Sequence, residues 1–400
     1  MTTENNMVQQ EEFYRIKKLP PYVFEEVNTL KAKLRGAGRD IIDLGMGNPD
    51  MPTPAHIVEK LVETARNPKA HRYSVSRGII GLRRAMARYY KRRFDVDLSP
   101  ETEIVATIGS KEGFANLAQA ITGPGDVILA PNPAYPIHAF GFIIAGGVIA
   151  AVPAPSPEAY LKGVADAIQV SHMKPRAMVL NYPSNPTAQV VGLDFYEEAV
   201  ALARKNDIYI LSDLAYGEIY FGDNPPPSIL QVDGARDIAV EINSLSKTFA
   251  MAGWRMGMAV GNERLIKALA RVKSYLDYGA FTPIQVAAVA ALDGPWECVE
   301  EIRNTYKRRR DTVVESFNMA GWDIPSPEAS MFAWAPIPEN FREKGSVEFA
   351  KMLMERADVA VAPGLGFGEE GDGHVRIGLV ENQQRIRQAA RNLKKVFKGK

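Results

Sequence analysis

Seven short apolar runs rich in β-branched residues recur along the middle of the chain, and this recurrence strongly constrains the fold. They span residues 103–108, 127–130, 148–152, 177–180, 208–211, 238–242 and 256–260. Segments of helical periodicity separate most of them, and such alternation favours a largely parallel sheet that is covered by helices on both faces. The sequence therefore predicts an α/β fold with a mostly parallel, seven-stranded sheet.

The length of the chain indicates more than one domain. Its 400 residues exceed the usual size of one hydrophobic core. We predict a large domain over residues 56–289 and a smaller α+β domain built from both chain ends, residues 19–55 and 290–400. Residues 1–18 are polar and lack periodicity, so we expect a flexible N-terminal arm.

Local patterns predict several further elements. Apolar residues at helical spacing predict helices over residues 23–34, 262–275 and 296–319. A basic run at residues 307–310 is interpreted as a solvated helix face. The longest apolar run, residues 139–152, is too short to span a bilayer and contains three glycines, so it predicts a helix end, a turn and a buried strand.

Composition narrows the possible partners. The 48 basic and 47 acidic residues leave a net charge of +1, which gives no electrostatic case for binding nucleic acid or an anionic membrane. The single cysteine, Cys298, excludes an internal disulfide and fits a reducing compartment. No secretory signal is visible, so we expect a cytoplasmic protein. We expect small-molecule substrates and predict no metal site.

The segment Asn243-Ser-Leu-Ser-Lys-Thr-Phe-Ala-Met-Ala-Gly-Trp-Arg255 carries the strongest chemical signal. It presents one amine, two hydroxyls and a guanidinium around a short turn. The amine of Lys247 can bond covalently to an aldehyde, while Ser244, Ser246 and Arg255 can bind a phosphate dianion. A lone Ser-x-Lys would indicate only a basic surface loop, but the spaced set predicts a site for pyridoxal 5'-phosphate.

Two other segments carry groups that such a cofactor needs. Asn185 lies just after an apolar run and can donate to the phenolic oxygen of the cofactor ring, as can Tyr216. Asp213 ends another strand-like run, and its carboxylate can keep the pyridine nitrogen protonated. Taken singly, Asn185 and Asp213 could equally be turn and cap residues.

A third segment lies where a strand passes through Gly109 into a helical pattern. Ser110 and Lys111 open that helix, where backbone N–H groups bind phosphate. The segment is not a P-loop, because the second glycine and the Gly-Lys-Ser/Thr ending are missing. Ligands of such sheets bind beyond the carboxyl ends of the strands, and Ser110, Lys247 and the groups above are all expected there.

Together these motifs resemble the class I and II aminotransferases, from about Leu19 to the C-terminus. The resemblance implies a fold type I enzyme that depends on pyridoxal phosphate. It further implies that Tyr135 stacks on the cofactor ring and that Tyr73 reaches the phosphate of the neighbouring subunit in a homodimer. Arg376 would clamp the substrate α-carboxylate, with help from the backbone of Gly47.

The sequence around Arg376 agrees with this role. The arginine alternates with Val375 and Ile377 on a short strand, so it points away from the apolar face, and its planar fork matches a carboxylate. A surface arginine remains the alternative when the residues are considered without the resemblance.

The resemblance implies ping-pong transfer of an amino group between an L-amino acid and a 2-oxo acid. Lys247 would move the proton at the substrate Cα, with Asp213 and Tyr216 as the other catalytic residues. Segments 19–24, 45–50, 73–78, 273–279 and 363–368 most resemble bacterial alanine (glutamate–pyruvate) aminotransferases.

Three alternatives to that activity stay open or are disfavoured. LL-diaminopimelate and aspartate aminotransferases are the neighbouring possibilities, although Tyr275 and Tyr278 suit a small or mixed pocket. A pyridoxal-phosphate lyase or decarboxylase is less favoured, because it need not keep the clamp at Arg376. A DNA-binding regulator with a related fold is disfavoured, since residues 1–18 are too short for a helix-turn-helix.

Overall fold

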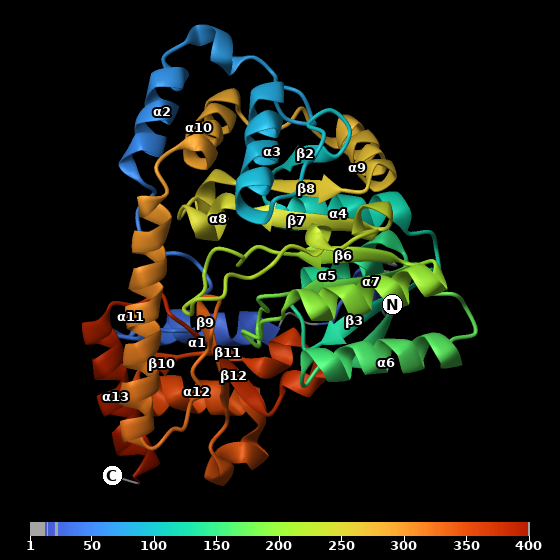
Figure 1. Ribbon diagram of the computed structural model, residues 1–400. Helices are drawn as coiled ribbons and strands as arrows, with labels where there is room; N and C mark the ends of the chain where they lie inside the picture. Colours follow the sequence, from blue (N-terminus) through green and yellow to red (C-terminus); the bar gives the residue numbers. More distant parts are fainter. Residues whose placement is uncertain (1–12, 14, 21–22, 399–400) are drawn as a thin grey trace, which may run out of the picture.

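The computed structural model describes residues 13, 15–20 and 23–398, and it is built around one large sheet (Figure 1). Most of the predicted N-terminal arm lies outside the described residues. The sheet has seven strands in the order β2-β8-β7-β6-β5-β3-β4. Their bounds are β2 Ile104–Thr107, β3 Val127–Asn132, β4 Val148–Pro153, β5 Ala177–Asn181, β6 Tyr209–Asp213, β7 Ala239–Ser244 and β8 Gly257–Gly261. The predicted seven-stranded α/β sheet is confirmed.

Only one strand of the large sheet breaks the parallel pattern. Strand β8 runs antiparallel to both β7 and β2, whereas the pairs from β7 across to β4 are parallel. The register pairs Asn181 with Asp213 and Asp213 with Ile242, so β5, β6 and β7 end at one edge. Loops that follow these strands therefore start side by side, which is the usual place for a ligand.

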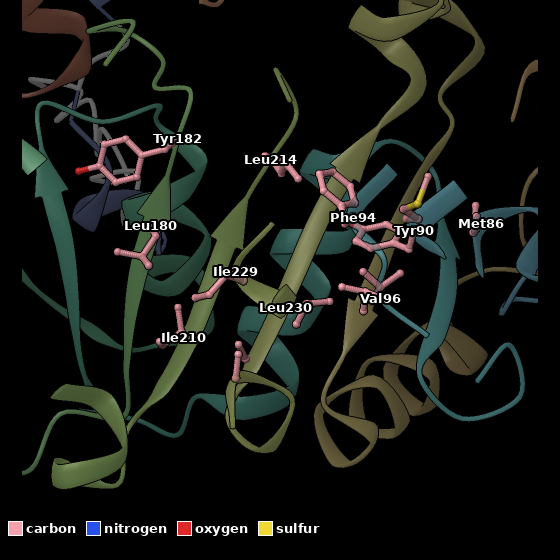
Figure 2. Close-up of a cluster of buried hydrophobic side chains, with 14 of the residues drawn as sticks. Met86, Tyr90, Phe94, Val96, Leu180, Tyr182, Ile210, Leu214, Ile229 and Leu230 are labelled. Carbon is pink, nitrogen blue, oxygen red and sulfur yellow. The ribbon is translucent and has the colours of Figure 1, made fainter. Parts of the chain in front are cut away.

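Helices cover both faces of this sheet (Figure 1). On one face α4, α5 and α9 share a buried cluster with the strands, and on the other α3, α6, α7 and α10 do so. Figure 2 shows part of the cluster beneath α3, α6, α7 and α10, including Tyr90 and Phe94 of α3. Each fully buried side chain of this size stabilises the fold by about 1.5–3 kcal/mol. The helices are α3 Ile80–Phe94, α4 Ser110–Ile121, α5 Ile137–Ala145, α6 Pro157–Val170, α7 Leu193–Asn206, α9 Glu263–Leu276 and α10 Thr282–Asp293.

A second buried cluster is formed mainly by the C-terminal part of the chain. It joins the three-stranded sheet β11-β12-β9 to three helices and to the strand β1, which pairs with β10. The strands are β1 Ile42–Asp43, β9 Phe332–Pro336, β10 Val359–Ala360, β11 Ala362–Pro363 and β12 His374–Gly378, and the helices are α11 Glu297–Ala320, α12 Gly345–Ala357 and α13 Gln383–Phe397.

Helix α11 links the two clusters. Helix α11 places Val299 in the core of the large sheet but Ile302 in the smaller cluster. Helix α1, Val23–Gly36, packs against α12 through Val27 and Met354. Helix α2, Ala55–Ala65, packs on α10, so it lies with the large sheet. The domain bounds at residues 55 and 290 stay a prediction. Among the described residues, no helix is long and apolar enough to cross a membrane.

Two local expectations are wrong. Strand β4 is not buried as predicted, because it forms the edge of the sheet and pairs only with β3, so within it only Val152 is fully covered. The basic run at residues 307–310 is not wholly solvated either. Arg309 is buried and holds Asp50 through both terminal nitrogens at 2.6 Å, since it faces the segment that follows β1.

Candidate active site

A cavity of about 570 Å³ lies at the carboxyl ends of β5, β6 and β7. It brings together residues that the sequence scatters over most of the chain. All of the predicted site residues except Tyr73 line it: Gly47, Ser110, Lys111, Tyr135, Asn185, Asp213, Tyr216, Ser244, Ser246, Lys247, Arg255 and Arg376.

One end of the cavity is a positively charged cradle. Helix α4 begins at Ser110 after Gly109, whose φ of 76° is one that glycine adopts without strain. A Cβ at Gly109 would clash with Nη2 of Arg255, so a larger residue here would have to displace that guanidinium. Ser244 accepts a hydrogen bond from the backbone N–H of Ser246 at 3.1 Å at the start of α8, Leu245–Thr248. A helix N-terminus beside a guanidinium and two hydroxyls suits a phosphate dianion.

Lys247 follows strand β7 directly and extends into the cavity from α8. Its amine donates to the carbonyl oxygen of Gly47 at 2.8 Å. Burial, followed by the positive charges of Arg376 and Arg255, lowers the pKa of Lys247 from 10.5 to about 8. A neutral amine is the nucleophilic form, so the surroundings prepare Lys247 to react near neutral pH.

Asp213 is held rigidly at the end of β6. Its Oδ2 lies 2.9 Å from Nε2 of His138, and its Oδ1 accepts the backbone N–H of Ala215 at 3.0 Å. His138 is fully buried near the start of α5. No role was predicted for His138 from the sequence. Its only signal was its position one helical turn after Tyr135, whose ring centroid lies 5.9 Å away.

Asn185 connects two other predicted residues. Its Oδ1 accepts a hydrogen bond from Nη1 of Arg376 at 2.8 Å, and its Nδ2 lies 3.5 Å from the hydroxyl of Tyr216. Burial raises the pKa of Tyr216, which keeps its phenol protonated. The side chain of Arg376 lies over the ring of Phe332, and the residue is only 7% exposed. The structure therefore rules out the surface arginine that the sequence alone left open.

The remaining predicted residues lie outside this cavity. Tyr73 is 86% exposed, and its ring stacks near Tyr278 with the centroids 4.7 Å apart. Tyr275 and Tyr278, which we expected beside the substrate, are 76% and 63% exposed and do not line the cavity of this chain. Tyr275 lies in the last turn of α9, and Tyr278 follows the end of that helix.

Comparison with known proteins supports the same chemistry. The family model described as aminotransferase class I and II matches residues 39–393. A relative from Rhizobium meliloti (strain 1021), named as an aminotransferase without a stated substrate, is 65% identical over 96% of this chain and 95% of its own. The glutamate-pyruvate aminotransferase of Escherichia coli (strain K12) is 53% identical over 97% of this chain and 94% of its own.

Two further matches extend the comparison. An LL-diaminopimelate aminotransferase of Moorella thermoacetica is 42% identical over 97% of this chain and 98% of its own. The solved structure of substrate-bound BacF from Bacillus subtilis has a TM-score of 0.88 at 37% identity, covering 96% of this chain and 97% of that one. The chain is therefore an aminotransferase and belongs to the class I and II aminotransferase family.

Proposed function

We propose that this aminotransferase binds pyridoxal 5'-phosphate in the cavity and moves amino groups between L-alanine and 2-oxoglutarate. The main support for the proposal is the position of the buried Lys247 amine. It lies between the positively charged end of the cavity at Arg255 and the guanidinium of Arg376. One end of the cavity thus suits a phosphate and the other a carboxylate, with a reactive amine between them.

The residues present fit the cofactor. The space that a Cβ at Gly109 would fill is left to Arg255, so a guanidinium stands at the N-terminus of α4. Asp213 offers a carboxylate to a ring nitrogen, and Tyr135 offers an aromatic face. When bound, pyridoxal phosphate supplies a conjugated cationic ring that delocalises the electron pair left at the substrate Cα.

The side chains of this protein then divide the work of the reaction. Arg376 holds the substrate α-carboxylate and so fixes the direction of the Cα–H bond. Lys247 takes that proton as general base and would then deliver it, as general acid, to the aldehyde carbon of the bound cofactor. His138 and the N–H of Ala215 hold the Asp213 carboxylate in place, so its negative charge would be available to pair with the ring nitrogen of the bound cofactor.

Alanine is favoured over the alternatives by the comparisons. The relative named as a glutamate-pyruvate aminotransferase is 53% identical, against 42% for the LL-diaminopimelate aminotransferase. An aspartate aminotransferase remains the other alternative. A lyase is disfavoured by the buried guanidinium of Arg376, since a clamp on the α-carboxylate serves transamination.

A half-reaction screen tests this proposal. Purified holoenzyme is mixed with single amino acids while the cofactor absorbance is followed. We expect alanine and glutamate to convert the cofactor fastest, and pyruvate and 2-oxoglutarate to reverse the change. Fast conversion by LL-diaminopimelate or aspartate with slow conversion by alanine would contradict the alanine specificity, and no conversion by any amino acid would contradict the whole proposal.

We also propose that the active protein is a cytoplasmic homodimer. The aromatic patch formed by Tyr73, Tyr275, Tyr278 and Phe281 is exposed, and isolated subunits seldom leave so many large apolar side chains together in water. A second copy would cover the patch by two-fold symmetry and would allow Tyr73 to reach the partner's phosphate site. Sedimentation at micromolar concentration tests this: a stable, active monomer would contradict it.

A further inference from the structure

The cavity holds more positive charge than the proposed chemistry uses. Among the residues that the structure describes, five cationic ones line it: Lys31, Lys111, Lys247, Arg255 and Arg376. The last three have proposed roles toward the cofactor and the α-carboxylate. The amine of Lys111 lies 6.0 Å from the ring centroid of Tyr135, the residue proposed to face the cofactor ring. Lys31 therefore needs a separate explanation.

Lys31 belongs to a face of α1 that forms one wall of the cavity. Phe24, Val27, Asn28 and Lys31 all line it, and their spacing places them on one side of a helix. This wall contacts the carboxylate clamp through aromatic rings. Phe24 packs edge-on against Phe367 at 5.2 Å, and the guanidinium of Arg376 lies 4.7 Å from the ring centroid of Phe367.

A chain of polar contacts also joins Lys31 to the clamp. The Lys31 amine lies 2.9 Å from Asp43, and both side chains are nearly buried, at 11% and 13% exposure. The carboxylate of Asp43 accepts the backbone N–H of Gly45 at 3.1 Å. The carbonyl of Gly45 in turn accepts a hydrogen bond from Nη2 of Arg376 at 3.3 Å. Lys31 and Arg376 are thus connected through Asp43 and Gly45.

The pairing with Asp43 leaves Lys31 able to bind an anion. An ammonium group has three donors, and one carboxylate does not use them all. Asp43 has other partners, because Arg35 lies 3.5 Å from it in addition to the N–H of Gly45. Asp43 would therefore stay paired if Lys31 turned toward a ligand, and the positive charge of Arg35 offsets its repulsion of an anion.

We propose that Lys31 binds the distal carboxylate of a dicarboxylic substrate, the glutamate and 2-oxoglutarate pair, while Arg376 holds the α-carboxylate. Alanine and pyruvate carry only a methyl group beside the carbon that bears the amino or oxo group, so they do not reach Lys31. This inference rests on the proposed function, and it explains how one cavity accepts both a small and a dicarboxylic partner.

The test compares two inhibitors on the holoenzyme. Glutarate carries two carboxylates, whereas butyrate carries one on a chain of similar size. Their dissociation constants are measured by calorimetry for the wild type, Lys31→Met and Lys31→Arg. The matched control is Lys33→Met, which removes the same charge from the same helix at an exposed position outside the cavity.

We expect Lys31→Met to weaken glutarate binding about 10- to 100-fold, the loss of a charged hydrogen bond in a partly buried site. Butyrate binding should change about twofold or less, as its one carboxylate contacts Arg376. Lys31→Arg should restore most of the glutarate affinity, and Lys33→Met should behave as the wild type. The single-turnover rate with glutamate, relative to alanine, should fall with the glutarate affinity in Lys31→Met.

Two results would overturn the inference. If Lys31→Met weakens the binding of glutarate and of butyrate equally, Lys31 is a structural residue of the wall. If it weakens the binding of neither inhibitor, Lys31 does not belong to the substrate site. If Lys31→Met does not fold, Lys31→Gln replaces it with the same expected result, because glutamine still hydrogen-bonds Asp43. A wild type that converts no amino acid would contradict the proposed function, whereas the glutarate titration would still decide the role of Lys31.

Discussion

The lowered pKa of Lys247 gives a direct prediction about its reactivity. At a pKa of about 8, roughly a tenth of the Lys247 amines are neutral at pH 7, against roughly one in 3000 for an ordinary lysine. Because the neutral amine is the reactive form, the reactive fraction of Lys247 in the apoprotein at pH 7 should be roughly 300-fold larger than that of an ordinary exposed lysine. The reaction rate should rise with pH and level off above about 8.

Arg376→Gln separates the causes of this shift. Burial is the largest cause, and the charge of Arg376 is the next. Removing that charge should move the midpoint upward, but it should stay below 10.5 because burial remains. Modification by a small uncharged amine reagent, followed by peptide mass spectrometry over a range of pH, measures the midpoint, with exposed Lys33 as the internal reference.

Two outcomes would refute parts of this reasoning. If the midpoint of Lys247 in the wild type is that of an ordinary lysine, the cavity does not depress its pKa. An unchanged midpoint in Arg376→Gln would remove Arg376 as a cause. A control for access is the plateau rate of Lys247 at high pH, where its amine is neutral. A low plateau for Lys247 reports steric shielding, which leaves the midpoint unaffected.

Three further predictions follow from other parts of the structure. Asp213→Asn should slow the single-turnover half-reaction by about 10²-fold, as expected when a preorganised charge is lost; near-normal rates would mean that another group protonates the ring. Mixing Lys247→Ala with Tyr73→Phe subunits should create heterodimers with one intact site and about half the native activity per dimer, because each site would combine Lys247 of one subunit with Tyr73 of the other. If subunits are shown to exchange but the mixtures are no more active than the parent mutants, Tyr73 acts in the site of its own subunit or in no site. Glu241 is buried and accepts hydrogen bonds from Tyr90 and Ser228, and burial raises its pKa from 4.5 to about 7. The folded state then binds more protons than the unfolded state between these values, so the free energy of unfolding should fall by roughly 3 kcal/mol as pH rises through that window. Glu241→Gln should flatten this dependence in denaturant titrations, and an unchanged slope would contradict it.

Local patterns in the sequence were sufficient for much of the architecture. The largely apolar run at residues 238–242 predicted strand β7, because a strand buried on both faces is mostly apolar, and Glu241 is the charged exception within this run. The motif from Asn243 to Arg255 predicted a site, because its groups are close along the chain. Asn185 and Asp213 could be placed beside it, since parallel strands end at one edge of the sheet.

Tertiary structure alone decided the features that depend on distant contacts. His138 and Asp213 are 75 residues apart, and nothing near either one indicates the pairing. Arg309 resembles the exposed Lys307 and Arg308 in the basic run, yet it is buried because Asp50 lies opposite it. Lys31 is one of several charged residues on α1, and it faces the cavity because that helix packs on α12 beside β10 and β11. Periodicity records which face of an element is buried, but which residue meets which side chain depends on how the elements pack.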